Sequence, residues 1–392
     1  MKILIVSQYY YPERNSVADV ASFLANNNHD VTVLTAKPNY GFQRILEEYK
    51  NIDFEIVNGV KVHRLTISPR KYSRLSVICN YLSFYFKSLK YINKFKEKFD
   101  VVLSFSLSPV ISISAANKIK EKQNIPHILY CMDLWPESTV ATNAVSKDSL
   151  LYDILKKWSK NIYSKCDKII ISSPSFKQYF HDVLDLKDKQ YIYINQPIIK
   201  SKSDTINPII YEKKHNFVYA GNIAKLQLID EIVDGFYDLN NASLHLMGMG
   251  RELERIKDKI KNNNSVVYEG ALPIEQAERF FINADALIVS LDDKEYVGRT
   301  IPNKAIQYLS YGKPIICVAK GDCKELLEKC GGVIFADKDL SSIRSAYQKI
   351  ISLSDEEKEI MGKANKKYYD EHLTNDVLIK KIEDVLSSSI KN

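Results

Sequence analysis

The chain has 392 residues, of which 45% are hydrophobic and 26% are charged, and its formal net charge is +7. This length suggests two domains rather than one core, and the composition is typical of a soluble globular protein. No apolar run reaches the roughly 20 residues that a membrane span needs. The six cysteines are scattered, without a C-x-x-C pair, which argues against a disulfide framework and a structural metal site.

The N-terminus begins directly with an apolar segment, Ile3 to Val6. It lacks the basic, apolar and small-residue sections of a signal peptide. We therefore expect a cytoplasmic protein.

Alternating strand and helix patterns begin at once. Residues 2–7 read as a buried strand, 17–27 as a helix and 29–35 as a second strand, with further strands at 101–105, 127–130, 168–172 and 190–194. This β–α–β start favours a parallel sheet covered by helices. The polar stretch 197–208 then reads as a linker.

The same pattern starts again after the linker. Strands are expected at 216–220, 243–247, 266–269, 286–290, 315–318 and 332–335, with a helix over 228–239 and a final set of helices over 355–388. The fold class is therefore α/β, with two consecutive doubly wound domains. Such sheets bind ligands at the carboxyl ends of their strands, so we expect the functional residues in the loops that follow the strands.

Glycine placement argues against a nicotinamide cofactor. The loop after the first strand, residues 8–16, contains no glycine, whereas a dinucleotide fingerprint needs glycines there. The only G-x-G, Gly248-Met249-Gly250, lacks a third glycine. By itself it is equally compatible with a tight turn.

The stretch 298–314 contains a well-marked helix. Asn303 is a favourable N-cap, Gly312 a favourable stop, and Pro314 prevents continuation. Free N–H groups at the helix start, with Lys304 beside them, would form an anion site suited to a diphosphate, and Gln307 lies one turn further along, where a ribose hydroxyl would be in reach. The alternative is an ordinary capped helix with a solvated lysine.

Several short motifs follow one another along the chain. They are Tyr10-Tyr11-Pro12-Glu13, Asp133-Leu134-Trp135-Pro136-Glu137-Ser138, Tyr219-Ala220-Gly221-Asn222-Ile223 with Gln227 and Asp230 beyond it, Met247-Gly248-Met249-Gly250 with Glu252, Tyr268-Glu269-Gly270, Ala284-Asp285-Ala286, and Ile301-Pro302-Asn303-Lys304 with Tyr308-Leu309 and Gly312-Lys313-Pro314. Their order resembles that of family 4 glycosyltransferases, in the O-antigen and capsule branch that includes the L-fucosamine transferases. Singly none is specific, but together they are.

The resemblance implies a GT-B fold, in which two Rossmann-like domains face a cleft. Residues 1–200 would bind the acceptor, residues 201–370 the nucleotide-sugar, and residues 371–392 would form a helix packing back on the first domain. It implies a retaining, metal-independent reaction with a nucleotide-sugar, UDP-linked, as substrate and no further cofactor. The donor-binding positions carried over by match are Gly221, Asn222, Gln227, Gly248, Glu269, Pro302, Asn303, Lys304 and Gln307.

Two departures from the family pattern imply a weakened or unusual donor site. Gln307 stands where the family usually has a glutamate, and eight positions earlier is Arg299 rather than an acid. The glycine pair common after the first strand is replaced by Asn15-Ser16. The residues of that acceptor-side loop are Tyr11, Glu13, Asn15 and Ser16.

Two carboxylates follow a strand in the acceptor half. Asp133 or Glu137 would orient or deprotonate the acceptor hydroxyl if it reaches the substrate. Alternatively, Asp133 caps a turn while Trp135-Pro136 packs the loop.

The segment 70–99 is basic and aromatic. It contains many cations but a single acid, Glu97. Its aromatic residues are Tyr72, Tyr81, Phe84, Tyr85, Phe86, Tyr91, Phe95 and Phe99. A basic amphipathic helix suits anionic headgroups, which predicts peripheral attachment to the inner face of the cytoplasmic membrane. The alternatives are a helix that packs its aromatics on the domain, and nucleic-acid binding, for which no motif is present.

These features favour transfer of a sugar to a polyprenyl-diphosphate-linked saccharide in bacterial surface polysaccharide synthesis. Two alternatives remain open. A nucleotide-sugar 2-epimerase has the same fold but needs no membrane-facing helix. A non-catalytic subunit that binds a sugar nucleotide would tolerate the glutamine at position 307.

Overall fold

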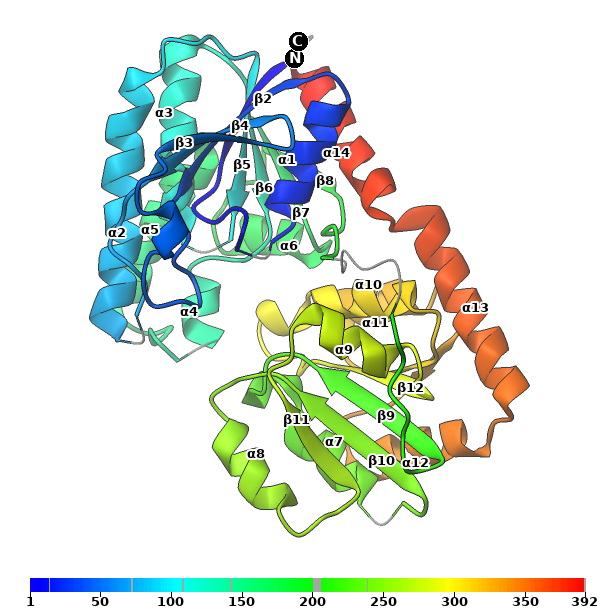
Figure 1. Ribbon diagram of the computed structural model, residues 1–392. Helices are drawn as coiled ribbons and strands as arrows, with labels where there is room; N and C mark the ends of the chain where they lie inside the picture. Colours follow the sequence, from blue (N-terminus) through cyan, green and yellow to red (C-terminus); the bar gives the residue numbers. More distant parts are fainter. Residues whose placement is uncertain are drawn as a thin grey trace. The chain divides into compact units, whose positions relative to one another are not determined.

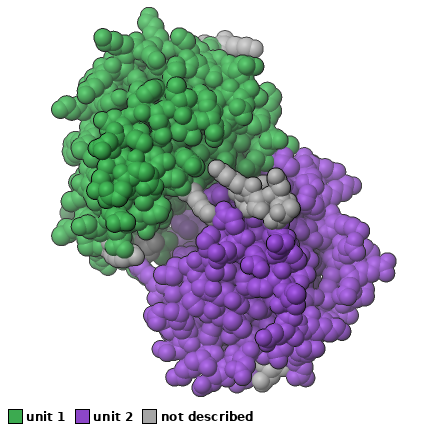
Figure 2. All heavy atoms as spheres, viewed as in Figure 1, with its two compact units in different colours: residues 1–197, 375–392 green, residues 198–374 purple. Residues whose placement is uncertain are grey.

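The structure is a computed structural model that describes residues 1–13, 15–71, 73–107, 109–141, 143–199, 206–237 and 239–390 (Figure 1). The chain divides into two compact units (Figure 2). Unit 1 comprises Met1–Pro197 and Asn375–Asn392, and unit 2 comprises Ile198–Thr374. Tyr72 of the basic segment and residues 200–205 of the predicted linker lie outside the described residues.

Eight described strands form the sheet of unit 1, in the order β3-β4-β2-β1-β5-β6-β7-β8. Of the strand pairs that the structure describes in this sheet, only that of the edge strand β3 with β4 is antiparallel. The strands are β1 (Lys2–Val6), β2 (Asp30–Ala36), β3 (Phe54–Val57), β4 (Val60–Leu65), β5 (Val101–Ser106), β6 (His127–Cys131), β7 (Lys168–Ile171) and β8 (Gln190–Tyr193).

Helices cover both faces of this sheet (Figure 1). The helices of unit 1 are α1 (Val17–Asn26), α2 (Arg74–Tyr91), α3 (Ser114–Gln123), α4 (Glu137–Ala141), α5 (Leu150–Ser164), α6 (Ser175–Asp182) and α14 (Asn375–Ile390). α2 and α3 share a core cluster with Leu4 and Val6 of β1, whereas α1 and α14 pack on the opposite face. Both faces of β1 are therefore buried under helices, which is why its sequence is a continuous apolar run.

The sheet of unit 2 has the order β11-β10-β9-β12-β13-β14, and its described strand pairs are all parallel. In chain order this is 3-2-1-4-5-6, the Rossmann order, whose switch point lies beside the first strand. The strands are β9 (His215–Ala220), β10 (Ala242–Met247), β11 (Val266–Gly270), β12 (Ala286–Ser290), β13 (Ile315–Val318) and β14 (Val333–Phe335).

The helices of unit 2 also form two layers (Figure 1). They are α7 (Ile229–Phe236), α8 (Leu253–Ile260), α9 (Ile274–Phe281), α10 (Asn303–Ser310), α11 (Gly321–Leu327), α12 (Leu340–Ser352) and α13 (Asp355–His372). α7, α8 and α12 pack on one face of the sheet in a single core cluster. On the other face, α9 contacts β9 and α10 contacts β12, and α13 packs against α10.

The predicted doubly wound α/β fold is confirmed, and the predicted strands match observed ones to within one or two residues at their ends. The hairpin of β3 and β4 was not predicted. It turns at Asn58-Gly59, where both residues have positive φ, 51° and 79°. Asn-Gly between apolar alternating residues is a strong hairpin signal, so the missing information was present in the sequence.

The helix α14 returns to unit 1 and packs against α1 and β5. Ile382 and Leu386 on this helix are fully buried, and Glu383 Oε1 lies 2.7 Å from His29 Nε2. Among the helices of the described residues, none combines the length and apolar character that would let it cross a membrane.

Ile382→Ala tests how strongly α14 is held. It leaves a cavity between α14 and the sheet, so we expect the free energy of unfolding of unit 1 to fall by about 2–5 kcal/mol in urea denaturation. Lys381→Ala, at an exposed position on the same helix, should change it by less than about 0.5 kcal/mol. Equal effects of the two variants would contradict the packing of α14.

Candidate functional site

A cavity of about 340 Å³ opens in unit 2 at the carboxyl ends of β9, β10 and β11. Its volume lies within the range of small-molecule sites, and its position is where open α/β sheets bind ligands. Its walls are formed mostly by small and apolar residues. The lining residues are Ala220, Gly221, Asn222, Met247, Gly248, Met249, Ala271, Leu272 and Ala277.

Two glycines let the loops after β9 and β10 touch. The Gly221 amide donates to the Met247 carbonyl at 2.9 Å. A Cβ atom at Gly248 would lie only 1.8 Å from the Gly221 carbonyl oxygen, and Gly248 has φ +128°. Gly248 is therefore required by close backbone approach as well as by its backbone angle.

Lys304 reaches from α10 to the loop after β9. Its Nζ donates to Gln227 Oε1 at 2.5 Å and lies 4.0 Å from the ring centroid of Tyr219. The same Nζ would be 3.3 Å from a Cβ atom at Gly221. The structure thus brings together three residues that the sequence motifs had placed in the donor site, Gly221, Gln227 and Lys304.

The start of α10 differs in one detail from its prediction. Asn303 is the first helical residue, and Pro302 occupies the N-cap position without a side-chain cap. The free amides at this helix start therefore have no side chain of their own to satisfy them. The predicted stop is confirmed, since the helix ends at Ser310 and Gly312 has φ +62°.

Within the described residues, the ammonium of Lys304 has no counter-charge. Among the described residues no carboxylate forms an ion pair with it, and its contacts are a neutral amide oxygen and an aromatic ring. Burial lowers the pKa of Lys304 to about 7. A half-buried cation of this kind is stabilised by a bound anion, which would also raise its pKa again.

Two predicted donor residues are turned to other partners. Glu269 Oε1 lies 2.7 Å from His245 Nδ1, and Gln307 Nε2 donates to the Tyr311 hydroxyl at 3.2 Å. Neither is among the described residues that line the cavity, and the same holds for Gln227 and Lys304, but Lys304 approaches the lining residue Gly221. Their predicted contacts with the nucleotide stay predictions that this placement does not support.

Two tyrosines that organise this site, Tyr219 and Tyr308, belong to the sequence motifs but were not among the predicted site residues. The Tyr219 hydroxyl donates to the Asn222 carbonyl at 2.8 Å, and the Tyr308 hydroxyl accepts from the Ala220 amide at 2.9 Å. Tyr308 lies four residues after Lys304 and therefore on the same face of α10. That spacing was a usable signal.

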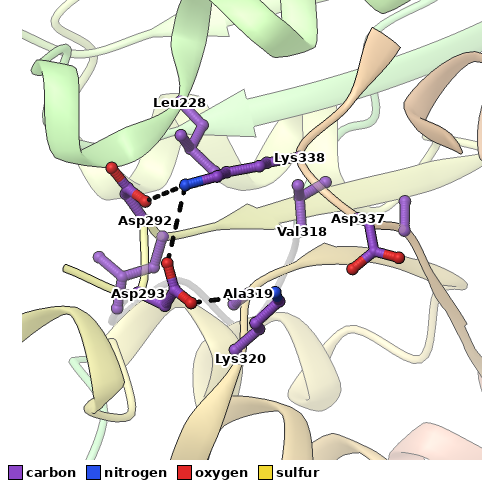
Figure 3. Close-up of a pocket in the computed structure, with 10 residues that line it drawn as sticks. Leu228, Asp292, Asp293, Val318, Ala319, Lys320, Asp337 and Lys338 are labelled. Carbon is purple, nitrogen blue, oxygen red and sulfur yellow. Dashed lines mark hydrogen bonds and ion pairs between the residues drawn. The ribbon is translucent and has the colours of Figure 1, made fainter. Parts of the chain in front are cut away.

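A second hollow lies at the carboxyl ends of β12, β13 and β14 (Figure 3). Its volume of about 20 Å³ admits little more than a water molecule. Figure 3 shows Lys338 directed at Asp292 and Asp293, at 3.1 and 3.8 Å, with Lys320 3.9 Å from Asp293. These charges neutralise one another, so the larger cavity is the better candidate.

In unit 1, Asp133 follows β6 and is half-buried. Burial raises its pKa to about 7, although hydrogen bonds from Ser138 and the Leu134 amide act in the opposite direction. Glu137 is only 1% exposed, and its carboxylate accepts a hydrogen bond from the Tyr152 hydroxyl. That placement does not support the predicted catalytic role of Glu137, and Asp133 is the better candidate for contact with substrate.

The acceptor-side loop is ordered by its own polar groups. Glu13 is buried, and its Oε1 accepts the Asn39 and Tyr40 amides, both at 2.6 Å. Burial raises the pKa of Glu13 to about 7. Asn15 Oδ1 accepts the Val17 amide at 3.0 Å and so opens α1. Of the remaining predicted residues of this loop, Ser16 is buried and Tyr11 is 39% exposed.

No metal site stands out in the part of the chain that the structure describes. Within those residues, no three histidine, cysteine, aspartate or glutamate side chains are grouped so that they could hold an ion. The metal-independent reaction implied by the resemblance stays a prediction.

Gly248→Ala tests the contact between the two loops. We expect it to destabilise unit 2 by roughly 3 kcal/mol or more in urea unfolding, since the new Cβ atom both strains the backbone and strikes the Gly221 carbonyl. Gly270→Ala is the matched control, because φ there is +96° but a Cβ atom has open space. It should lose only the backbone contribution, about 1 kcal/mol. Equal losses would show that the loops do not touch.

Comparison with known families identifies both units. Residues 14–198 match the model described as Glycosyltransferase Family 4, and residues 214–353 match Glycosyl transferases group 1. A curated relative, the probable glycosyltransferase WbjE of Pseudomonas aeruginosa, is 22% identical over 231 residues. That match covers 56% of this chain and 57% of WbjE, so the chain spans little more than half the length of this relative.

Solved structures share the whole fold at low identity. HepE of Anabaena, in complex with UDP and glucose, has a TM-score of 0.68 at 12% identity, covering 99% of this chain and 100% of HepE. WaaG, a glycosyltransferase involved in lipopolysaccharide biosynthesis, has a TM-score of 0.66 at 13% identity, covering 98% and 99%. From the two matched models and this shared architecture, the chain belongs to the family 4 glycosyltransferases and has their GT-B fold.

Proposed function

We propose that this protein transfers a sugar from a UDP-linked nucleotide-sugar to a lipid-linked saccharide in the synthesis of a bacterial surface polysaccharide. The observation that carries the proposal is the unpaired ammonium of Lys304 beside the glycine loops of the 340 Å³ cavity. WaaG, whose fold is similar, is involved in lipopolysaccharide biosynthesis. The neighbour HepE binds UDP and glucose.

The donor diphosphate would lie between Lys304 and the loops after β9 and β10. There the free amides at the start of α10 and the ammonium would neutralise the charge that develops on the leaving diphosphate. This arrangement would replace a metal ion. Metal independence and retention of configuration at the sugar carbon are taken over from the family resemblance.

The acceptor hydroxyl would meet Asp133. A carboxyl group with a pKa near 7 is ionised above about pH 7. The carboxylate can then orient or deprotonate a hydroxyl within hydrogen-bond reach. Because Glu137 is enclosed by its contact with Tyr152, Asp133 acts alone in this proposal.

The basic segment 70–99 contributes apolar side chains both to the core of unit 1 and to its surface. Phe84, Phe95 and Phe99 are buried in the core of unit 1, as the alternative of a packed helix required. Phe86 on α2 is 63% exposed, and Leu75 is 76% exposed. The aromatic residues of the segment are thus divided between core and surface.

A neighbouring helix enlarges the apolar surface. Tyr85 of α2 stacks edge-on against Trp158 of α5, with ring centroids 6.0 Å apart. Four and seven residues before Trp158, on the same helical face, are Ile154 and Leu151, 52% and 51% exposed. We define the α2–α5 surface as a set of exposed apolar residues: Leu75, Ile78 and Phe86 of α2 with Leu150, Leu151 and Ile154 of α5.

The α2–α5 surface suits attachment to an anionic membrane. Lys87, Lys90 and Lys94 are exposed on α2 and directly after it, and each cation near such a surface contributes about 1 kcal/mol. We propose that this surface holds the enzyme on the inner face of the cytoplasmic membrane, where a polyprenyl-diphosphate-linked acceptor is found.

The pH dependence of kcat/KM tests the two site residues together. Lys304 is cationic below a pKa of about 7, and Asp133 is an ionised base above a pKa of about 7. We therefore expect a narrow optimum near pH 7, with each limb falling about tenfold per pH unit. Nucleoside diphosphate release from UDP-sugars in the presence of lipid-linked acceptor is the measurement.

Each limb has its own variant. Lys304→Met should lower kcat/KM at least about tenfold and remove the alkaline limb, whereas Asp133→Asn should remove the acidic limb. Unchanged limbs would take these residues out of the reaction. Epimerised UDP-sugar without diphosphate release would favour the 2-epimerase, and binding without turnover would favour a non-catalytic subunit.

Membrane attachment is tested with vesicles containing phosphatidylglycerol. Leu151→Glu should weaken sedimentation with these vesicles by at least roughly tenfold, because a charge enters the buried apolar face. Ile360→Glu is the control, since Ile360 is 61% exposed on α13 of unit 2. It should leave vesicle binding unchanged, and equal weakening by both variants would contradict the α2–α5 surface as the contact.

A further inference from the structure

Arg70 occupies an aromatic cage in unit 1. Its guanidinium carbon lies 4.9 Å from the ring centroid of Tyr40 and 5.3 Å from that of Tyr81. Its Nη1 donates to the Tyr81 hydroxyl at 2.8 Å and to the Tyr9 hydroxyl at 3.1 Å. Arg70 is the first cation of the basic segment 70–99, and it is folded back against the loops after β1 and β2.

The rest of the guanidinium is unsatisfied. Arginine carries five N–H donors in a planar fork, and here only Nη1 has acceptors within the described residues. No described carboxylate forms an ion pair with Arg70. As far as the described residues show, Nη2 and Nε are therefore free donors and the cation has no charge to neutralise it.

A buried polar network holds the loop that carries Arg70. The Arg70 amide donates to Asn39 Oδ1 at 3.1 Å, and Asn80 Nδ2 donates to the same oxygen at 2.9 Å. Gln8 Nε2 in turn donates to Asn80 Oδ1 at 2.7 Å. Asn39 and Asn80 are both fully buried. The guanidinium is thus fixed in place before any ligand arrives, which lowers the entropy lost on binding.

The surroundings indicate an anion with an apolar tail. Tyr81 belongs to α2, and α2 begins at Arg74, only four residues after Arg70, with the exposed Leu75 next in sequence. The free donors therefore lie at the end of the helix that carries the α2–α5 surface. Asp133 is near enough to Tyr81 to act on its ionisation, so the cage and the candidate base belong to the same end of the sheet.

We propose that Arg70 binds the diphosphate that links the acceptor saccharide to its lipid. The proposal rests on the proposed function, because it assumes a lipid-linked acceptor. A planar guanidinium fork matches two phosphate oxygens, and the charge-assisted hydrogen bonds are of the strong kind. The lipid would continue from the diphosphate toward the α2–α5 surface.

Binding of geranyl diphosphate, measured by calorimetry, tests this site without requiring turnover. The full chain with Lys304→Met is used throughout, so that the ammonium of unit 2 does not contribute. We expect this chain to bind geranyl diphosphate but not geraniol, and added Arg70→Gln to weaken binding at least roughly tenfold. Added Arg74→Gln removes an exposed charge close by and should change affinity less than about twofold.

A second variant guards against loss of the fold. Arg70→Lys keeps the charge but loses the planar fork, so it should bind more weakly than Arg70 even if Arg70→Gln does not fold. Undiminished affinity in the folded Arg70 variants would overturn the proposal. So would tighter binding of glucuronate, a sugar carboxylate without a lipid tail, than of geranyl diphosphate. If binding depends on Arg70 but no sugar is transferred from any donor, the proposed function fails while this site stands.

Discussion

An unpaired, half-buried ammonium is the feature on which the account of this enzyme depends. Lys304 is held by an amide oxygen of Gln227 and by the ring of Tyr219, and neither contact supplies negative charge. Burial of a cation without a counter-ion costs free energy, and a bound anion recovers it. An anionic ligand would supply the missing negative charge, and in the proposed function that ligand is the donor diphosphate.

The Rossmann sheet of unit 2 places this ammonium. Because β9, β10 and β11 are adjacent and parallel, their following loops meet at one edge, and the glycines at 221 and 248 allow two of those loops to touch. Tyr308, one turn beyond Lys304, ties α10 to the end of β9. In unit 1 the same arrangement of loops after parallel strands gathers Asp133, Glu13 and the Arg70 cage. Both units thus gather charged side chains at the carboxyl edge of their sheet.

The sequence was a good guide wherever local pattern decides structure. Buried parallel strands are continuous apolar runs, so the fold and most strand positions could be predicted, and the Asn58-Gly59 turn would have added the hairpin. Gly221, Gln227 and Lys304 were also placed together by motif. Side-chain direction was less accessible, since Glu269 and Gln307 turn to His245 and Tyr311, partners that only the tertiary fold brings near. The same is true of α5, whose exposed face joins that of α2 through the Tyr85–Trp158 contact.

The most direct test of the account is a crystal structure of the protein with bound UDP. We expect the diphosphate at the start of α10, with Lys304 Nζ within about 3 Å of a phosphate oxygen and the loops at Gly221 and Gly248 against the phosphates. UDP bound in another part of unit 2, with Lys304 still directed only at Gln227 and Tyr219, would contradict it.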